Sequence, residues 1–316
     1  MYLIEEYSPK TLNEFIMNPF LNRLLNSIIA TDDIQILLMG DYSCGKTTLI
    51  NLIIGQYYQL KMSNRTVQNN IYKINSLNEQ GITSFRPNLK TFCQTNSLIN
   101  GKKKVVIIDD MDNLNNQNQQ ILRNCIDKYR NKVHFIFTCN NLQKILDNIQ
   151  SRVTILNIPN LTKEQLFDYF NSILINKHII IDKSNIELII RISNYNMNSI
   201  FNNLQKLILL NREITTDDIM HNCTTINFDI FNKFIVEIDN NNYKNATNIL
   251  YSLFDNGYSV NDILENFFEY VKFNEDLLLE KRYKYFNIIC KYITYFYTIH
   301  EDKCELFLFV REIIKC

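Results

Sequence analysis

The first half of the chain alternates short apolar runs with longer amphipathic stretches. Five of the runs have the length of a strand, and they predict strands over residues 35–39, 71–74, 105–108, 133–137 and 153–158. Runs that are apolar at nearly every position are typical of strands buried on both faces, as in a parallel sheet that helices cover. The stretches over residues 47–57 and 115–129 have the period of a helix. This alternation predicts a doubly wound α/β domain, with its active edge at the carboxyl ends of the strands.

Beyond Pro159 the pattern becomes helical. Thr162 followed by Gln165 forms a capping box, which predicts the start of a helix that runs to residue 176. Further segments of helical period cover residues 184–193, 197–210, 228–237, 245–254, 260–272 and 277–298, and another helix is expected to start at 216–219. The sequence therefore predicts three domains: an α/β domain over 1–160, a small helical lid over 161–224 and a larger all-α domain over 225–316.

The composition narrows the classes of function. Lys and Arg total 33 and Asp and Glu total 33, so the net charge is zero and no global field draws the chain to nucleic acid or an anionic membrane. No apolar run approaches the roughly 18–20 residues of a membrane span. The 8 cysteines are scattered without a C-x-x-C pair, which indicates reduced thiols. We therefore expect an intracellular protein without membrane contacts, whose four histidines, lacking metal-ligand spacing, are structural.

One segment fits the phosphate-binding pattern G-x-x-x-x-G-K-[ST]. It consists of Gly40, Asp41, Tyr42, Ser43, Cys44, Gly45, Lys46 and Thr47, and we count Thr48 with it. The segment follows a predicted strand and opens a predicted helix, which is the context that the motif requires. Its glycines let successive N–H groups point inward, and the helix N-terminus adds positive potential. Lys46 is expected to contact the β- and γ-phosphates, and Thr47 to hold Mg²⁺.

Polar residues at the ends of two other strands complete the expected site. Residues 105–108 form an apolar strand that ends in Asp109 and Asp110. Asp109 is expected to orient Mg²⁺ and its waters, and Asp110 to act as the base that polarises the attacking water. Asn140 follows the next strand and is expected to hydrogen-bond the γ-phosphate or this water. The alternative for the two acids is an ordinary strand-to-helix turn with carboxylates near a helix N-terminus.

Five stretches, in this order, resemble the small subunits of replication factor C, which are clamp-loader members of the AAA+ ATPases. They are residues 6–12 against the family's KYRPKTL box, the phosphate loop, residues 74–82 against LNASDERGI, residues 109–112 against DEAD with 119–123 against the following AQxALRR, and residues 151–153 against SRC. The match covers residue 7 to about residue 205, and the remainder resembles the family's collar only in helical pattern. The resemblance implies an AAA+ domain with a parallel five-stranded sheet, a helical lid and an all-α collar.

The resemblance also implies a function. Such subunits form heteropentamers that use ATP and Mg²⁺ to open a sliding clamp and place it on primer–template DNA during replication, in the nucleus or at a viral replication site. In this chain Tyr7 matches the box that lies near the adenine. Arg152 matches the finger that reaches the γ-phosphate of the adjacent subunit and offsets charge in the transition state.

Two basic residues are expected to hold DNA by its phosphates. Arg86 and Lys90 match DNA-contacting positions of the family, and at a spacing of four they share a helix face. Phosphate contacts position a duplex without reading its sequence. The alternative for both residues is a solvated basic face. Pro87 is expected in the first turn of this helix, and the lysines at 102–104 are expected to form a solvated turn at the end of the sheet opposite the nucleotide.

Three residues depart from the family's pattern. Asp110 replaces a glutamate, which moves the carboxylate by about 1.5 Å, Asn198 replaces the arginine of GDMRR, and Ser8 replaces a basic residue. We therefore expect ATP binding, while hydrolysis at the chain's own site stays open. The two readings are an ATP-driven clamp-loader subunit and a nucleotide-binding scaffold subunit of the same complex with little turnover. The signatures at 81–82 and 151–153 argue against a third, a branch-migration helicase or an unfolding chaperone.

Overall fold

The structure is a computed structural model that describes residues 2–59, 64–75, 82–177, 179, 181–210, 214–223, 226, 228–274, 277–296 and 300–315. It divides into two compact units. The first comprises Met1–His178 with Ser193–Gln205, and the second Ile179–Ile192 with Lys206–Cys316. This division runs through the lid predicted over 161–224, so the three-domain plan stays a prediction.

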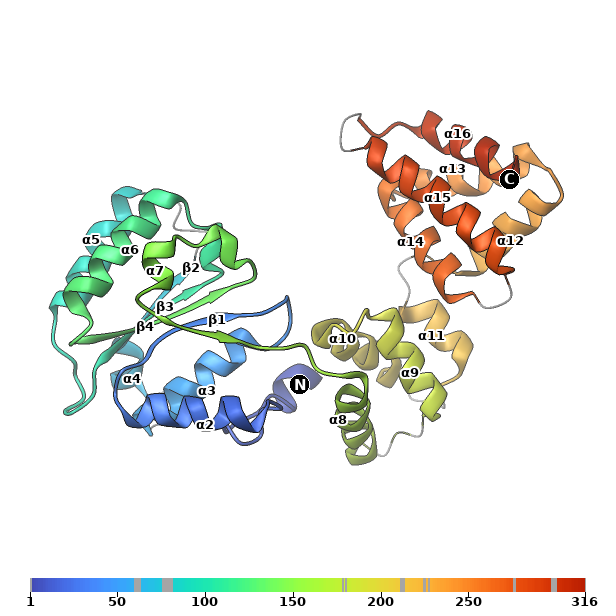
Figure 1. The fold of residues 1–316 in the computed structure, drawn as a ribbon. Helices are drawn as coiled ribbons and strands as arrows, with labels where there is room; N and C mark the ends of the chain where they lie inside the picture. The colour runs from blue at the N-terminus through green and yellow to red at the C-terminus, as the bar shows by residue number, and fades with distance from the viewer. Residues whose placement is uncertain are drawn as a thin grey trace. The chain divides into compact units, whose positions relative to one another are not determined.

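The first unit is built on a parallel sheet (Figure 1). Its strands are β1 (Gln35–Met39), β2 (Ile71–Asn75), β3 (Lys104–Asp109), β4 (Val133–Cys139) and β5 (Thr154–Asn157). They lie in the order β2-β3-β4-β1-β5, and each neighbouring pair is parallel. This confirms the predicted five-stranded parallel sheet, with strand ends that differ from the prediction by no more than two residues. The order brings β1 beside β4, so the phosphate loop and the end of β4 lie at one edge.

Helices cover both faces of the sheet (Figure 1). One face carries α2 (Pro19–Ala30), α3 (Lys46–Tyr58) and α4 (Arg65–Asn69), and the other α5 (Ile82–Gln94), α6 (Asn116–Tyr129) and α7 (Asp147–Gln150). Successive strand residues enter opposite cores: Val105 and Ile107 pack on the first face, and Val106 and Ile108 on the second. Residues 104–108 of β3 are buried at every position, which explains why the apolar run at 105–108 is continuous.

Shorter elements and two further helices complete this unit. They are α1 (Leu3–Glu6), η1 (Met111–Asn113), η2 (Leu142–Lys144), α8 (Lys163–Asn176) and α10 (Met197–Ile208), which ends just beyond the unit's last residue. The predicted capping box opens α8. Its Thr162 hydroxyl accepts from the Gln165 N–H at 3.3 Å, and the Gln165 side chain accepts from the Thr162 N–H at 3.0 Å.

A buried histidine joins several elements at the amino-terminal edge of the sheet. His134, in β4, is inaccessible to solvent. Its Nδ1 accepts from the N–H of Ile34 at 3.2 Å, and its Nε2 lies 3.1 Å from Oδ1 of Asp32. The same Asp32 oxygen accepts from the Tyr57 hydroxyl of α3 at 2.8 Å. Burial lowers the pKa of His134 to about 4, so the imidazole is neutral at pH 7.

The lysines at 102–104 do not form the predicted solvated turn. Lys104 is buried, and its ammonium donates to the carbonyl of Phe92 at 3.2 Å. Burial lowers the pKa of Lys104. Lys103 donates to the carbonyl of Asp32 at 2.6 Å. The prediction was wrong because the long stem of a lysine can lie in the protein while its ammonium reaches a carbonyl.

The second unit is helical. It contains α9 (Lys183–Ile192), α11 (Thr216–Cys223), α12 (Phe228–Asp239), α13 (Tyr243–Asp255), α14 (Val260–Phe273), α15 (Leu279–Tyr295) and α16 (Lys303–Ile314). The sequence predicted all of these except α16. Asp302 caps α16 by accepting from the N–H of Cys304 at 3.1 Å.

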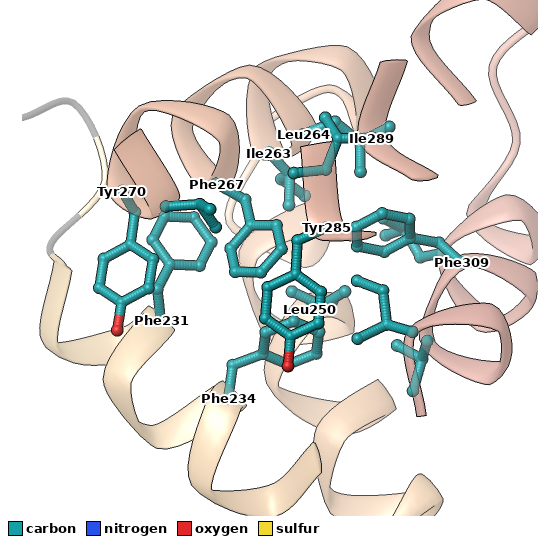
Figure 2. Close-up of a cluster of buried hydrophobic side chains, with 14 of the residues drawn as sticks. Phe231, Phe234, Leu250, Ile263, Leu264, Phe267, Tyr270, Tyr285, Ile289 and Phe309 are labelled. Atoms are coloured by element: carbon teal, nitrogen blue, oxygen red, sulfur yellow. The ribbon is translucent and has the colours of Figure 1, made fainter. Parts of the chain in front are cut away.

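An aromatic cluster forms the core of helices α12–α16 (Figure 2). Phe267 lies at its centre, with ring centroids 5.4 Å from Phe231, 5.3 Å from Phe234 and 6.0 Å from Phe309. These separations lie within the range at which aromatic pairs attract each other. Phe267 contributes from α14, two of its partners from α12 and the third from α16, so one side chain ties three helices together.

Candidate nucleotide-binding site

The phosphate loop turns sharply between β1 and α3. Gly45, the N-cap of α3, has φ +92°, and Ser43 has φ +62°, so the backbone twice enters the left-handed region. A Cβ at Gly45 would lie 2.9 Å from a ring carbon of Phe15, and one at Gly40 would lie 2.8 Å from the carbonyl oxygen of Ile158. Both positions therefore require glycine, because the chain packs directly against them.

The ammonium of Lys46 is fixed at the mouth of this loop. It donates to the carbonyls of Gly40 at 2.8 Å and Asp41 at 2.7 Å, and to Oδ1 of Asn140 at 2.7 Å. These three bonds use its full donor capacity, and the side chain is only 7% exposed. A phosphate oxygen that enters the loop would bond this ammonium by replacing one of the three acceptors, of which Asn140 is the side-chain one.

The first acid of the pair is linked to the loop through hydroxyl groups. The Thr47 hydroxyl donates to Oδ2 of Asp109 at 3.0 Å, and the Thr138 hydroxyl donates to Oδ1 at 2.6 Å. Thr138 also accepts from the N–H of Asp110 at 2.8 Å. Lys73 lies 3.9 Å from Oδ2 of Asp109. Sequence reasoning missed Thr138, because within an apolar strand it looks like an ordinary β-branched residue.

The Thr47 hydroxyl and the Asp109 carboxylate are the kinds of oxygen ligand that Mg²⁺ prefers. No group of three or more His, Cys, Asp and Glu that could hold a metal occurs within the described ranges. The protein alone thus supplies too few ligands there for a closed cage. Mg²⁺ commonly completes its shell with water and substrate phosphates, so this donor set fits a Mg²⁺ ion that arrives with a nucleotide.

Asp110 lies close enough to Asp109, Asp112 and Lys46 for their charges to act on its carboxyl group. Its backbone is left-handed, with φ +51°, and its Oδ1 accepts weakly from Nδ2 of Asn140 at 3.5 Å. Burial, followed by the charges of Asp109 and Asp112, raises the pKa of Asp110. The side chain lines the cleft that contains the phosphate loop.

This cleft has a volume of about 990 Å³, and it is lined by the phosphate loop and by residues 14–19, 158–162 and 194–198, among others. Tyr7 and Tyr169 contribute aromatic surface, and the Tyr169 hydroxyl donates to the Tyr7 carbonyl at 2.9 Å. A cleft of this size, with an apolar wall and a polar phosphate loop, suits a nucleotide.

The charged lining of the cleft is mostly acidic. Its charged side chains within the described chain are Lys46, Glu14, Asp41 and Asp110, so Lys46 is the one cation among them. Asn198, at the start of α10, also lines the cleft. Because an amide carries no charge, Asn198 offers no second cation to a phosphate group.

The structure brings most of the predicted site residues together. Residues 41–48 line the cleft together with Tyr7, Asp110 and Asn140, whereas Gly40 is not among its described lining residues. Asp109 contacts Thr47. Arg152 is not among the described residues that line the cleft. It follows α7 and is held by α6 instead. It is thus separated from the other predicted catalytic residues of its own chain, as a finger for a neighbouring chain would be.

The predicted DNA-binding residues lie on α5. Lys90 is exposed, whereas the side chain of Arg86 lies outside the described part of the chain. Pro87 lies inside α5, which starts at Ile82, and not in its first turn as predicted. The prediction was wrong because the helix begins five residues before the proline, within the segment that the family motif covers. At a spacing of four on one helix, Arg86 and Lys90 share a face.

Comparisons with known proteins agree with this architecture. Residues 36–159 match the ATPase family associated with various cellular activities (AAA), and residues 226–293 match the replication factor C C-terminal domain. The chain is 27% identical to a putative replication factor C small subunit of Acanthamoeba polyphaga mimivirus over 85% of this chain and 83% of the relative. It is 29% identical to a replication factor C small subunit of Methanococcus maripaludis over 85% and 84% of the two chains.

A solved structure of the RuvB Holliday junction branch migration motor from Thermotoga maritima has a TM-score of 0.51 to this chain. The two are 18% identical over 68% of this chain and 72% of the other, a likeness that shows the fold alone. None of the helices in the described part combines the length and apolar character needed to cross a bilayer. The AAA match over the cleft and the C-terminal match over the aromatic core together place the chain in the replication factor C family of AAA+ ATPases.

Proposed function

We propose that this chain is an ATP-binding subunit of a clamp loader. It acts with other clamp-loader subunits in a heteropentamer that opens a sliding clamp and places it on primer–template DNA, inside the cell, in the nucleus or at a viral replication site. The observation that carries the proposal is the convergence of Lys46 and Thr47, which follow β1, with Asp109 at the carboxyl end of β3, two strands that β4 separates in the sheet. The match to the replication factor C C-terminal domain supports the assignment to a clamp loader.

In this proposal the phosphates of ATP lie in residues 40–47, where the N–H groups of the loop and the N-terminus of α3 offset negative charge. Lys46 contacts the β- and γ-phosphates, and the adenine lies toward Tyr7. Thr47 and Asp109 would hold Mg²⁺, which would supply positive charge beside the phosphates. The 3.0 Å contact between Thr47 and Asp109 supports this assignment, because one ion can contact both oxygens.

Hydrolysis would use three further residues. Asp110 orients the attacking water and accepts its proton, and Asn140 hydrogen-bonds the γ-phosphate or the water. Arg152 serves the site of the adjacent subunit, where its guanidinium offsets charge that develops on the transferred phosphoryl group. The contacts of Asn140 with both Lys46 and Asp110 support its place between phosphate and base.

The second candidate function is a scaffold subunit that binds nucleotide with little turnover. Two observations favour it: Asp110 is shorter than the family's glutamate, and Asn198 puts a neutral amide in the cleft. The turnover of the assembled complex with Asp110→Asn decides between the two functions. An unchanged turnover supports the scaffold, whereas a loss supports the enzyme. Asp110→Glu is expected to raise turnover in either case, because it restores the reach of the carboxylate.

Nucleotide binding is tested directly by equilibrium dialysis of the chain with ATP and Mg²⁺. The chain is expected to take up ATP, and Lys46→Ala is expected to abolish uptake because it removes the one cation that the described lining provides. Lys128→Ala, on exposed surface of α6, is the matched control. If neither the chain nor its native assembly takes up adenine nucleotide, the proposal is wrong.

A further inference from the structure

Arg152 is held by contacts within its own chain. Its Nε donates to Oδ1 of Asp127 at 2.5 Å, and its Nη1 donates to the carbonyl of Asn148 at 2.6 Å. The Ser151 hydroxyl is a further acceptor for Nη1 at 3.3 Å. The partners come from α6, α7 and the turn after α7, so two helices define where the guanidinium lies.

These contacts use Nε and Nη1 of the guanidinium and leave Nη2 available. A guanidinium carries five N–H donors in a planar fork, and Nε and Nη1 supply the bonds to Asp127 and Asn148. Nη2 contacts no partner within the described part of the chain, and the side chain is 27% exposed. Because the guanidinium is planar, fixing Nε and Nη1 also sets the direction in which Nη2 can donate.

The carboxylate of Asp127 is shared with a second guanidinium. Nε of Arg123 lies 3.5 Å from Oδ2 of Asp127, while Oδ1 faces Arg152. One carboxylate between two guanidiniums leaves the cluster with a charge of +1. Without the carboxylate, the two cations would repel each other, and Arg152 would keep only its neutral acceptors.

We propose that Asp127 is the residue that positions the Arg152 finger for the neighbouring subunit's nucleotide. The inference rests on the proposed function, because it takes Arg152 as the finger. Asp127 is not among the described residues that line the chain's own cleft; it fixes Nε so that Nη2 is presented to the phosphate. A finger that is oriented before the subunits meet loses less freedom when it contacts the phosphate, which is the reason that preorganised groups accelerate a reaction.

The test is the steady-state ATPase of the assembled complex with clamp and DNA, with variants introduced only in this chain. The turnover that is lost in Arg152→Ala is the part of the ATPase activity that depends on the finger. Asp127→Ala is expected to lower that part about 10-fold, since a displacement of roughly 1 Å in a reacting geometry costs up to about 100-fold. Asp127→Glu is expected to restore it to within about threefold, because the carboxylate can again reach Nε.

A purely structural role would not give this pattern. The KM for ATP and the affinity of the isolated chain for ATP are expected to stay within about twofold of wild type, because Asp127 is remote from the chain's own cleft. The matched control is Asp33→Ala, which removes an equivalent ion pair with Arg130 at 2.6 Å and should leave turnover unchanged. If Asp127→Ala does not assemble, Asp127→Asn replaces it, since the amide keeps an acceptor oxygen without the charge.

Three results would overturn the inference, and they can be told apart. If Arg152→Ala lowers turnover and Asp127→Ala does not, Asp127 has no positioning role, while the finger and the proposed function stand. If Arg152→Ala itself leaves turnover unchanged, the finger assignment fails, and the role of Asp127 fails with it. A loss in Asp127→Ala that Asp127→Glu does not relieve also contradicts positioning through the carboxylate.

Discussion

Replacing Thr138 by valine tests whether a buried hydroxyl organises the metal-binding carboxylate. The hydroxyl is fully buried, donates to Asp109 at 2.6 Å and accepts from the N–H of Asp110 at 2.8 Å. Thr138→Val keeps the shape of the side chain but removes both bonds. Asp109 then loses the contact that fixes its Oδ1, and the N–H of Asp110 loses its acceptor.

The energies of these two hydrogen bonds set the expected loss of stability and of ATP affinity. A hydrogen bond to a charged group contributes about 1.5–3 kcal/mol, and a buried N–H left without a partner costs about 1–3 kcal/mol. Allowing for local relaxation, we expect Thr138→Val to lower the free energy of unfolding by about 2–4 kcal/mol. If half of this free energy is lost from the binding of ATP with Mg²⁺ because Asp109 is misplaced, the affinity falls about 5- to 30-fold, since each 1.4 kcal/mol is a factor of ten.

Isothermal titration calorimetry with ATP checks this, once with Mg²⁺ and once with a chelator. The weakening is expected only with Mg²⁺, because Asp109 acts through the ion. Thr138→Ser, which keeps the hydroxyl, should bind like wild type, and so should Thr154→Val, a control at an exposed position of β5. Equal weakening with and without Mg²⁺, or none at all, would refute the reasoning.

Three further predictions follow from other parts of the chain. The free energy of unfolding is expected to fall by about 2–3 kcal/mol between pH 7 and pH 4.5 because of His134. Its pKa is about 4 in the fold and 6.5 in the unfolded chain, so mainly the unfolded chain gains a proton in this range. Urea unfolding at several pH values should show the fall, and His134→Asn should flatten the profile. Phe267→Ala is expected to cost about 3–5 kcal/mol in urea unfolding because it empties the centre of the aromatic core, whereas Phe307→Ala, at an exposed position, should cost less than about 1 kcal/mol. Replacing Arg86 and Lys90 together by glutamine is expected to weaken DNA binding and to lower the slope of log affinity against log salt by about two at most, and an unaltered slope would exclude them as phosphate contacts.

The sequence was sufficient to predict the sheet and the residues that gather at its edge. Continuous apolar runs indicate strands buried on both faces, and the carboxyl ends of parallel strands lie together. Asp109 and Asp110 at the end of β3 and Asn140 after β4 could therefore be expected near the phosphate loop from the sequence alone. Their proximity needs no knowledge of register, because each residue stands at a strand end.

Thr138 could not be predicted in the same way. Within β4 it has the appearance of an ordinary β-branched strand residue, and only the register gives it a role. Ile108 pairs with Phe137, so Thr138 lies beside Asp109 and can bond both it and the next N–H. Hydrophobic pattern predicts that two strands are buried, but it leaves their relative shift undetermined until the packing fixes it.

Helix α16 was also not predicted, although the spacing of its apolar residues indicated a helix. Leu306, Phe309, Val310 and Ile313 follow the spacing of a buried helix face, and all four are buried in the C-terminal core. Without this segment, Phe267 would lack one of its ring partners, and the core of α12–α15 would be open on one side. The position of Pro87, in contrast, depends on where α5 begins, which composition alone does not determine.

Under the proposed function, the charge of the cleft and the position of Arg152 make nucleotide binding depend on the neighbouring chain. The described lining sets Lys46 against three carboxylates, so a triphosphate is poorly compensated by its own chain. Arg152 is fixed by Asp127 outside that cleft, where it is useful only if another chain brings a phosphate. Each chain then completes a neighbour's site and needs a neighbour to complete its own. Linkage makes the two effects equal: whatever free energy the neighbour's guanidinium adds to ATP binding, ATP adds to the association of the chains.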